Sequence, residues 1–185
     1  MRLFKNYLLN SSYQILLILL PLITAPYLSR VLGASGVGIN AFTNSVVFYF
    51  SLFSILGTFT YGNREIAYYQ NDKKKRSEIF WGINFLSWMI AGITYIVFLI
   101  FISMTQRYQA YYLWQSLIIL ANLFDISWYF MGMEKFKITV TRNLIFKILT
   151  VIAIFIFVRD QNDLIRYIAI AGIGSLLSSL SLWPY

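Results

Sequence analysis

The stretch PLITAPYLSRVLGASGVG at residues 21–38 interrupts what is otherwise an apolar membrane segment. Pro21 and Pro26 each remove a backbone N–H donor and bend a helix. Arg30 adds a permanent charge, which costs a few kcal/mol at membrane depth unless it is paired or hydrated. Such interruptions are tolerated only where they are buried in protein or line a wet cavity. The stretch therefore predicts a bend and a tight outer turn between two cavity-lining helices, the turn being formed by Gly33, Gly36 and Gly38.

The composition predicts an all-α polytopic membrane protein. Of the 185 residues, 59% are hydrophobic, 19% are aromatic and only 12% are charged. The apolar runs are long and continuous, whereas a transmembrane barrel would show short alternating segments. The chain has no cysteine and no histidine, so thiol chemistry and the commonest general base and metal ligand are excluded. We expect no catalytic residue, no metal and no cofactor. The net charge of +8 is interpreted as loop charge, not as a nucleic-acid surface.

The apolar runs predict six membrane helices within one unit that covers residues 1–185. Each approaches the ~20 residues that a bilayer requires. The first run is too long for a signal peptide and lacks a small-residue cleavage pattern, so we interpret it as a retained helix. The predicted helices cover approximately residues 8–31, 38–60, 79–104, 110–131, 144–158 and 164–185.

The basic residues predict a cytoplasmic N-terminus. With that orientation, eleven Lys and Arg residues fall on the inner side and four on the outer side, and all seven lysines are inner. This asymmetry follows the positive-inside rule. The densest charge cluster is the run Asp72–Arg76, which we interpret as a solvated loop that anchors the topology. Contact with anionic lipid headgroups is the alternative.

Polar residues fall on single faces of several predicted helices at 100° per residue. Two explanations stay open: hydrogen bonds between neighbouring helices, or a shared hydrated cavity, which the coincidence of several stripes favours. The helix at 144–158 shows no such stripe and is expected to face lipid or to pack at the periphery. The stripes comprise Asn10, Gln14, Pro21 and Thr24 on the first helix, Asn40, Asn44, Ser51, Ser54 and Thr58 on the second, Asn84, Ser87, Trp88 and Tyr95 on the third, and Tyr111, Gln115, Asn122, Asp125 and Tyr129 on the fourth.

Asp125 is the sole carboxylate within a predicted span. Alone and buried, it would be neutral or very costly. A salt bridge to Lys147, one turn into the helix at 144–158, is one interpretation. A cation- or proton-coupling site is the other. Near the inner end of the second span, Arg64 and Glu65 are adjacent, so we expect them to point to different sides and not to pair.

These residues carry a family resemblance that extends over nearly the whole chain. The stretches are PLITAPYLSRVLGASGVG at 21–38, YGNREIA at 61–67, DISWYFMGMEKFKITVTRN at 125–143 and FVRDQNDLIRY at 157–167. In their order and spacing they resemble the N-terminal part of bacterial polysaccharide flippases of the Wzx type. These belong to the multidrug/oligosaccharidyl-lipid/polysaccharide exporter superfamily.

The resemblance implies two six-helix lobes in the cytoplasmic membrane that work by alternating access. The implied substrate is an undecaprenyl-pyrophosphate-linked oligosaccharide repeat unit, exported for surface polysaccharide synthesis without enzymatic chemistry. Implied partners include membrane lipids, a polysaccharide polymerase and assembly proteins. Guanidinium groups bind phosphate oxygens bidentately, so Arg30 and Arg64 are candidate phosphate contacts. Gln14, Asn40 and Asn44 are candidate cavity residues.

The implied family members are more than twice this length, so the chain is expected to be a fragment that lacks the C-terminal lobe. The alternative is a half-transporter that pairs with a second copy. Two other functions stay open: a multidrug cation antiporter of the same superfamily, which would favour cavity carboxylates, and an integral-membrane polysaccharide-processing enzyme, which would need an acid–base constellation.

Overall fold

A computed structural model describes residues 19–184, and the described part is helical throughout, with no strand. The first described helix covers residues 19–31 and continues through both prolines. The elements that follow are α2 (Gly33–Ile55), α3 (Thr58–Tyr68), α4 (Lys73–Met104), α5 (Gln109–Leu123), α6 (Ser127–Gly132), α7 (Phe136–Phe157), η1 (Gln161–Asp163) and α8 (Leu164–Leu180).

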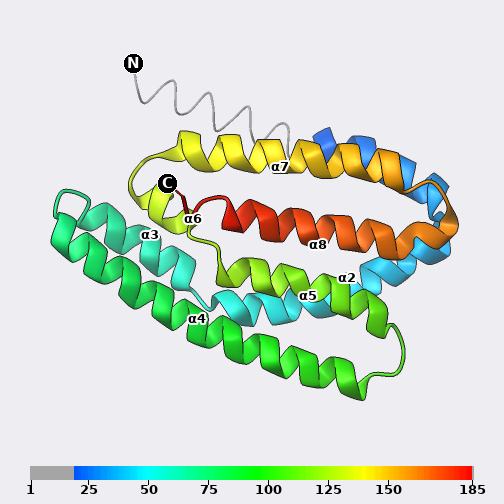
Figure 1. Ribbon diagram of the computed structural model, residues 1–185, viewed down its shortest axis with the longest axis horizontal. Coiled ribbons are helices and arrows are strands. Elements are labelled where there is room, and N and C mark those ends of the chain that lie inside the picture. The colour runs from blue at the N-terminus through cyan, green and yellow to red at the C-terminus, as the bar shows by residue number, and fades with distance from the viewer. Residues whose placement is uncertain (1–18, 185) are drawn as a thin grey trace.

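The long helices lie side by side with α5 at the centre of the molecule (Figure 1). Helix α5 packs against α2, α4 and α8, while α7 packs on the other side of α8. Helices α3 and α4, α4 and α5, and α7 and α8 run in opposite directions because the turns that join them are short, whereas α3 continues in the direction of α2. Van der Waals packing holds such a bundle together in lipid, since lipid tails are as apolar as the helix surfaces.

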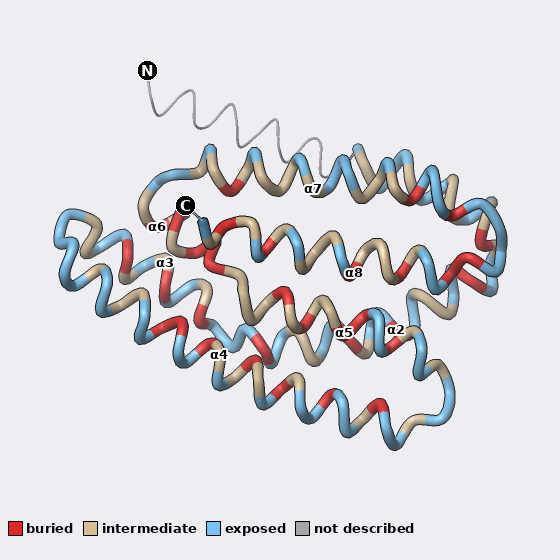
Figure 2. Tube along the Cα trace, viewed as in Figure 1, coloured by how far each residue is buried: buried red, intermediate tan, exposed pale blue. Residues whose placement is uncertain are grey.

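The buried side chains face inward between the helices, and the outer surfaces of α4 and α7 are exposed (Figure 2). One apolar cluster surrounds Val47, Phe98, Tyr112 and Ile119, where α2, α4 and α5 meet. Large apolar side chains such as Phe85 are exposed at 63%. A continuous apolar exterior is what a bilayer requires.

Four stretches of the described part are long and apolar enough to cross a membrane: Gly33–Tyr68, Lys73–Met104, Phe136–Phe157 and Gln161–Leu180. The all-α polytopic prediction is thus confirmed. The boundaries differ from those predicted. The second span extends to Tyr68 but breaks at Leu56 and Gly57, which both have positive φ values, 37° and 77°. The run at 110–131 breaks into α5 and α6.

The turns divide between two ends of the molecule, which allows a comparison with the predicted orientation. The α3–α4 turn, the α6–α7 turn and the end of α8 lie together, opposite the α4–α5 and α7–α8 turns (Figure 1). Residues Lys73–Lys75 begin α4 and Lys135 precedes α7 at the first end, which we call the lysine-rich end. Arg107 and Arg159 lie in turns at the other end. The orientation in the membrane stays a prediction.

The connection between the first described helix and α2 consists of one residue, Leu32. Gly33 follows at φ +67°, a conformation that residues with a Cβ rarely adopt. Leu32 is buried against Ile154, Val158 and Leu164, so the turn is packed into the α7–α8 end. Beyond the turn, Gly36 approaches Leu32, whereas a Cβ at Gly38 would meet open space.

Candidate functional site

Hydrogen bonds join the polar stripes of α2 and α5. Gln115 on α5, which is 2% exposed, donates through Nε2 to Thr43 Oγ1 at 3.0 Å and to Asn40 Oδ1 at 3.5 Å. Near the C-terminal ends of the same two helices, Asn122 Nδ2 donates to Ser54 Oγ at 2.8 Å. Hydrogen bonds between neighbouring helices are one of the two explanations that we gave for the polar stripes, and these bonds are of that kind. Asn44, on the exposed side of α2, takes no part in them.

Two helix breaks meet around a small polar cavity. The α2–α3 break and the α5–α6 break contribute Thr58, Asn122 and Asp125, while α4 contributes Ser87. The cavity volume is about 30 Å³, which is enough for one or two water molecules. Discontinuous helices whose freed polar groups face a cavity are typical of ion and substrate sites in transporters.

Asp125 lines that cavity as the middle residue of the α5–α6 break at 124–126. Its Oδ1 accepts a hydrogen bond from the Ser127 N–H at 2.9 Å, which satisfies a donor at the start of α6. No ion pair joins Asp125 to Lys147: the ion pairs among residues 19–184 are Arg64–Glu65 and Arg166–Asp163. The structure therefore shows no salt bridge between Asp125 and Lys147.

A second polar surface lies between α7 and α8, centred on Lys147. Helix α7 begins at Phe136, eight residues before the predicted start, so Lys147 is eleven residues from its beginning and ten from its end. A groove of about 350 Å³ is lined there by Asn143, Lys147, Thr150, Ser175 and Ser178, among others. Near the bilayer midplane a lysine costs about 3 kcal/mol, and such residues almost always face a bundle interior or a water-filled cavity.

This groove corrects the expectation that the fifth predicted span lacks a polar stripe. Thr139, Asn143, Lys147 and Thr150 are spaced by four, four and three residues and share one face of α7. The spacing is visible in the sequence once the helix is extended to 136. Close by, Arg142 donates to the Ser178 carbonyl at 2.7 Å and to Asn143 Oδ1 at 2.5 Å. These bonds fix one side of the groove.

The candidate phosphate contacts are both at the surface. Arg30, near the end of the first described helix, is exposed and makes no hydrogen bond or ion pair to any described residue. Arg64 is also exposed, with Nη2 3.3 Å from Glu65 Oε1 and its guanidinium 5.5 Å from the Tyr61 ring centroid. The expectation that Arg64 and Glu65 do not pair is wrong, because the long guanidinium side chain reaches back along the helix surface. Gln14 lies outside the described residues.

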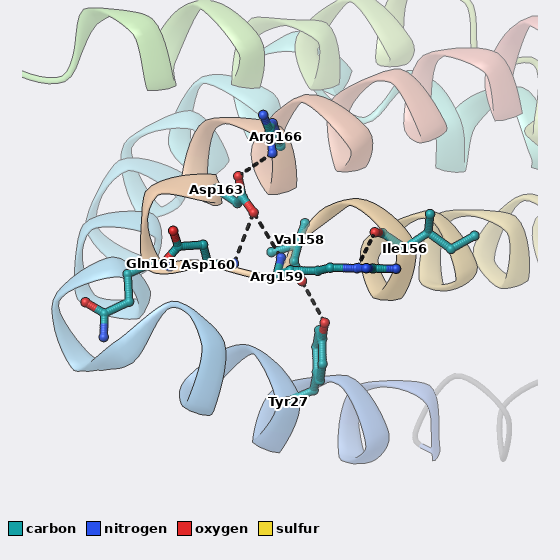
Figure 3. A network of polar contacts seen from close by, with 8 residues as sticks. All are labelled: Tyr27, Ile156, Val158, Arg159, Asp160, Gln161, Asp163 and Arg166. Carbon is teal, nitrogen blue, oxygen red and sulfur yellow. Dashed lines mark hydrogen bonds and ion pairs between the residues drawn. The ribbon is translucent and has the colours of Figure 1, made fainter.

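Hydrogen bonds to one carboxylate organise the α7–α8 turn. Asp163, 8% exposed, accepts from the Arg159 and Asp160 N–H groups at 2.9 and 3.1 Å and from Arg166 at 2.7 Å (Figure 3). Tyr27 donates from the first described helix to the Val158 carbonyl at 2.6 Å. The turn thereby holds that helix at the end of α7 and α8 that lies opposite the lysine-rich end.

Comparisons with known proteins agree with this membrane architecture. A family described as "Polysaccharide biosynthesis protein" matches residues 3–185. A protein of Escherichia coli (strain K12) named "Putative O-antigen transporter" is 31% identical over 157 residues, which is 83% of this chain and 37% of that protein. The chain therefore spans well under half the length of this relative. No solved structure gives a significant match. The resemblance to Wzx-type flippases is thus confirmed at the level of the family, and the chain belongs to the polysaccharide biosynthesis protein family, as a multi-pass protein of the bacterial inner membrane.

Proposed function

We propose that this protein moves lipid-linked oligosaccharide repeat units across the cytoplasmic membrane for the synthesis of a cell-surface polysaccharide. The observation that carries the proposal is the likeness to a protein named as an O-antigen transporter, which extends over 83% of this chain. The family match over residues 3–185 supports the same process. Flipping makes and breaks no covalent bond, so no catalytic constellation is required of the chain.

The proposed mechanism is alternating access between two lobes, of which the present chain supplies one. The sugar headgroup crosses along a hydrated protein surface while the polyprenyl tail remains in the lipid. The α7–α8 groove supports this role, because it brings together Lys147, near the middle of a helix long enough to span a membrane, and neighbouring hydroxyl and amide groups. The second lobe would come from the remainder of a longer protein or from a second copy of this chain.

The pyrophosphate linkage requires cations at the ends of the path. Arg30 and Arg64 suit that task because each is exposed and a guanidinium presents several donors in a planar fork. Glu65 and Tyr61 hold the Arg64 guanidinium close to the surface of α3. A phosphate group that displaced Glu65 from Arg64 would cost the protein little stability, since exposed ion pairs contribute about 0–1 kcal/mol.

Asp125 is the proposed coupling residue. It lines the cavity between two helix breaks, where protonation or cation binding could bias the two arrangements of the lobe. Asp125→Asn keeps the oxygen that accepts from Ser127 but removes the charge. We expect normal expression with lost transport, whereas lost expression would assign Asp125 a purely structural role.

Complementation tests the function directly. The gene encoding this chain, expressed at full length in a strain without its own flippase, should restore surface polysaccharide. Loss of the Lys147 charge in Lys147→Met should lower restoration about tenfold or more, given 1.5–3 kcal/mol for a hydrogen bond to a charged group. Lys147→Arg should retain most of it, and Lys137→Met is the matched control at the helix end. No restoration by a normally inserted wild-type protein would sink the proposal.

A further inference from the structure

A groove at the lysine-rich end carries a second binding site that does not depend on the proposed transport. It lies where the start of α4 meets α6 and the residues after α8, and its volume is about 360 Å³. Its rim is cationic and its wall is aromatic. The residues used here are Lys73, Arg76, Phe80, Trp81, Tyr129 and Trp183.

The cations of the rim are available to an anionic ligand. Lys73 is exposed, and no carboxylate among residues 19–184 lines the groove. The neighbouring Asp72 carboxylate caps α4 by accepting from the Lys74 and Lys75 N–H groups at 3.0 and 3.1 Å, and no ion pair within the described residues joins it to Lys73 or Arg76. Arg76 donates through Nη1 to the Gln70 carbonyl at 2.8 Å. That bond fixes the guanidinium at the rim and leaves its other N–H groups without a hydrogen bond to any described residue.

The aromatic wall is held in place by its own contacts. Phe80 lies with ring centroids 5.4 Å from Trp81, 5.0 Å from Tyr129 and 6.5 Å from Trp183. Trp183 donates through Nε1 to the Phe124 carbonyl at 2.9 Å and stacks on Trp88. Rigid Trp and Tyr side chains at the end of membrane helices mark the level of lipid headgroups. The groove is therefore polar where headgroups lie and apolar toward the acyl chains.

We propose that this groove binds an anionic phospholipid, with the phosphate between Lys73 and Arg76 and an acyl chain along the Phe80–Trp183 wall. Charge complementarity selects the ligand: two cations, in a groove that no carboxylate of residues 19–184 lines, favour a net negative headgroup over a zwitterionic one. Each cation near an anionic lipid surface raises affinity about fivefold. Loss of both should lower it about 25-fold, if the two contributions add.

Tryptophan quenching by brominated lipid tests the site in the full-length protein, purified in mixed micelles. Brominated phosphatidylglycerol should quench Trp81 and Trp183 emission at a lower mole fraction than brominated phosphatidylcholine does. Lys73→Gln/Arg76→Gln should abolish that preference. Lys73 is exposed, and its side chain makes no ion pair with any described residue. Lys73→Gln alone should therefore weaken the preference for the anionic lipid about fivefold. Trp81→Phe should remove part of the quenchable signal.

The matched control removes the same charge from the same run. Lys74 and Lys75 do not line the groove, so Lys74→Gln/Lys75→Gln should keep the preference. Equal loss in both double variants would reduce the effect to general surface charge and overturn the site. Equal quenching of the wild type by the two brominated lipids would mean that lipid contacts the protein without headgroup selectivity, which would also overturn the site. Displacement of the brominated lipid by a polyprenyl pyrophosphate at equimolar amounts would reassign the groove to a different ligand.

Discussion

Asp163 shows how one side chain can organise the α7–α8 turn. Its carboxylate accepts from two backbone N–H groups and from Arg166. Asp163→Ala leaves the Arg159 and Asp160 N–H groups without that acceptor at a nearly buried position. We expect a loss of about 1–2 kcal/mol in stability, the usual cost of a lost cap. Thermal unfolding of the purified protein, followed by circular dichroism, measures this loss.

Arg166→Ala is the comparison for that prediction. It removes the ion pair but leaves both backbone bonds to Asp163, and the Arg166 side chain is 69% exposed. Exposed pairs contribute about 0–1 kcal/mol, so this variant should unfold at a temperature close to that of the wild type. Equal losses for Arg166→Ala and Asp163→Ala would mean that charge pairing, and not capping, holds the turn, because Asp163→Ala removes both.

At the scale of elements, the short helices α3 and α6 pack so closely that a glycine on α3 is required. A Cβ added at Gly62 would lie 2.5 Å from Trp128 Cε3 of α6. Gly62→Ala should therefore cost about 1–3 kcal/mol through overpacking. Gly82→Ala on α4, where a Cβ meets nothing within 4 Å, should be neutral or stabilise by roughly 0.5–1 kcal/mol.

Fluorescence-detected size exclusion after a heating step compares the two variants. Gly62→Ala should lose its monodisperse peak at a lower temperature than the wild type, and Gly82→Ala should not. Similar behaviour of the two would show that Trp128 moves aside without cost, and that α3 and α6 are not locked together.

Periodicity and length located the long helices, but they did not locate the breaks. No glycine or proline marks the α5–α6 break at 124–126, which instead depends on Asp125 bonding to the Ser127 N–H. The start of α7 was placed late because Lys137, Arg142 and Lys147 lower the hydropathy of its first half. The same error hid the stripe around Lys147. The predicted stripes include Asn40, Ser54, Gln115 and Asn122, since their spacing places them on single helix faces. They omit Thr43, and only the structure pairs Gln115 with Thr43 and Asn122 with Ser54.

For the whole molecule, the arrangement of turns makes the membrane orientation testable. Asn71 lies in the α3–α4 turn at the lysine-rich end and Gln106 in the α4–α5 turn at the opposite end, and both are exposed. The sequence has no cysteine, so a single introduced thiol is labelled without background. Positive-inside charge bias places the lysine-rich end in the cytoplasm.

Gln106→Cys should therefore react with a membrane-impermeant maleimide in intact spheroplasts, whereas Asn71→Cys should react only after lysis. The two positions differ in which side of the bilayer they face, not in burial, so protection of Asn71→Cys reports the membrane barrier alone. The reverse pattern would invert the lobe. It would move the groove at Lys73 and Arg76 to the outer leaflet and put Arg30 at the cytoplasmic end. Labelling of both positions in intact spheroplasts would mean that α4 does not cross the bilayer, which its 32 residues and apolar exterior make physically unfavourable.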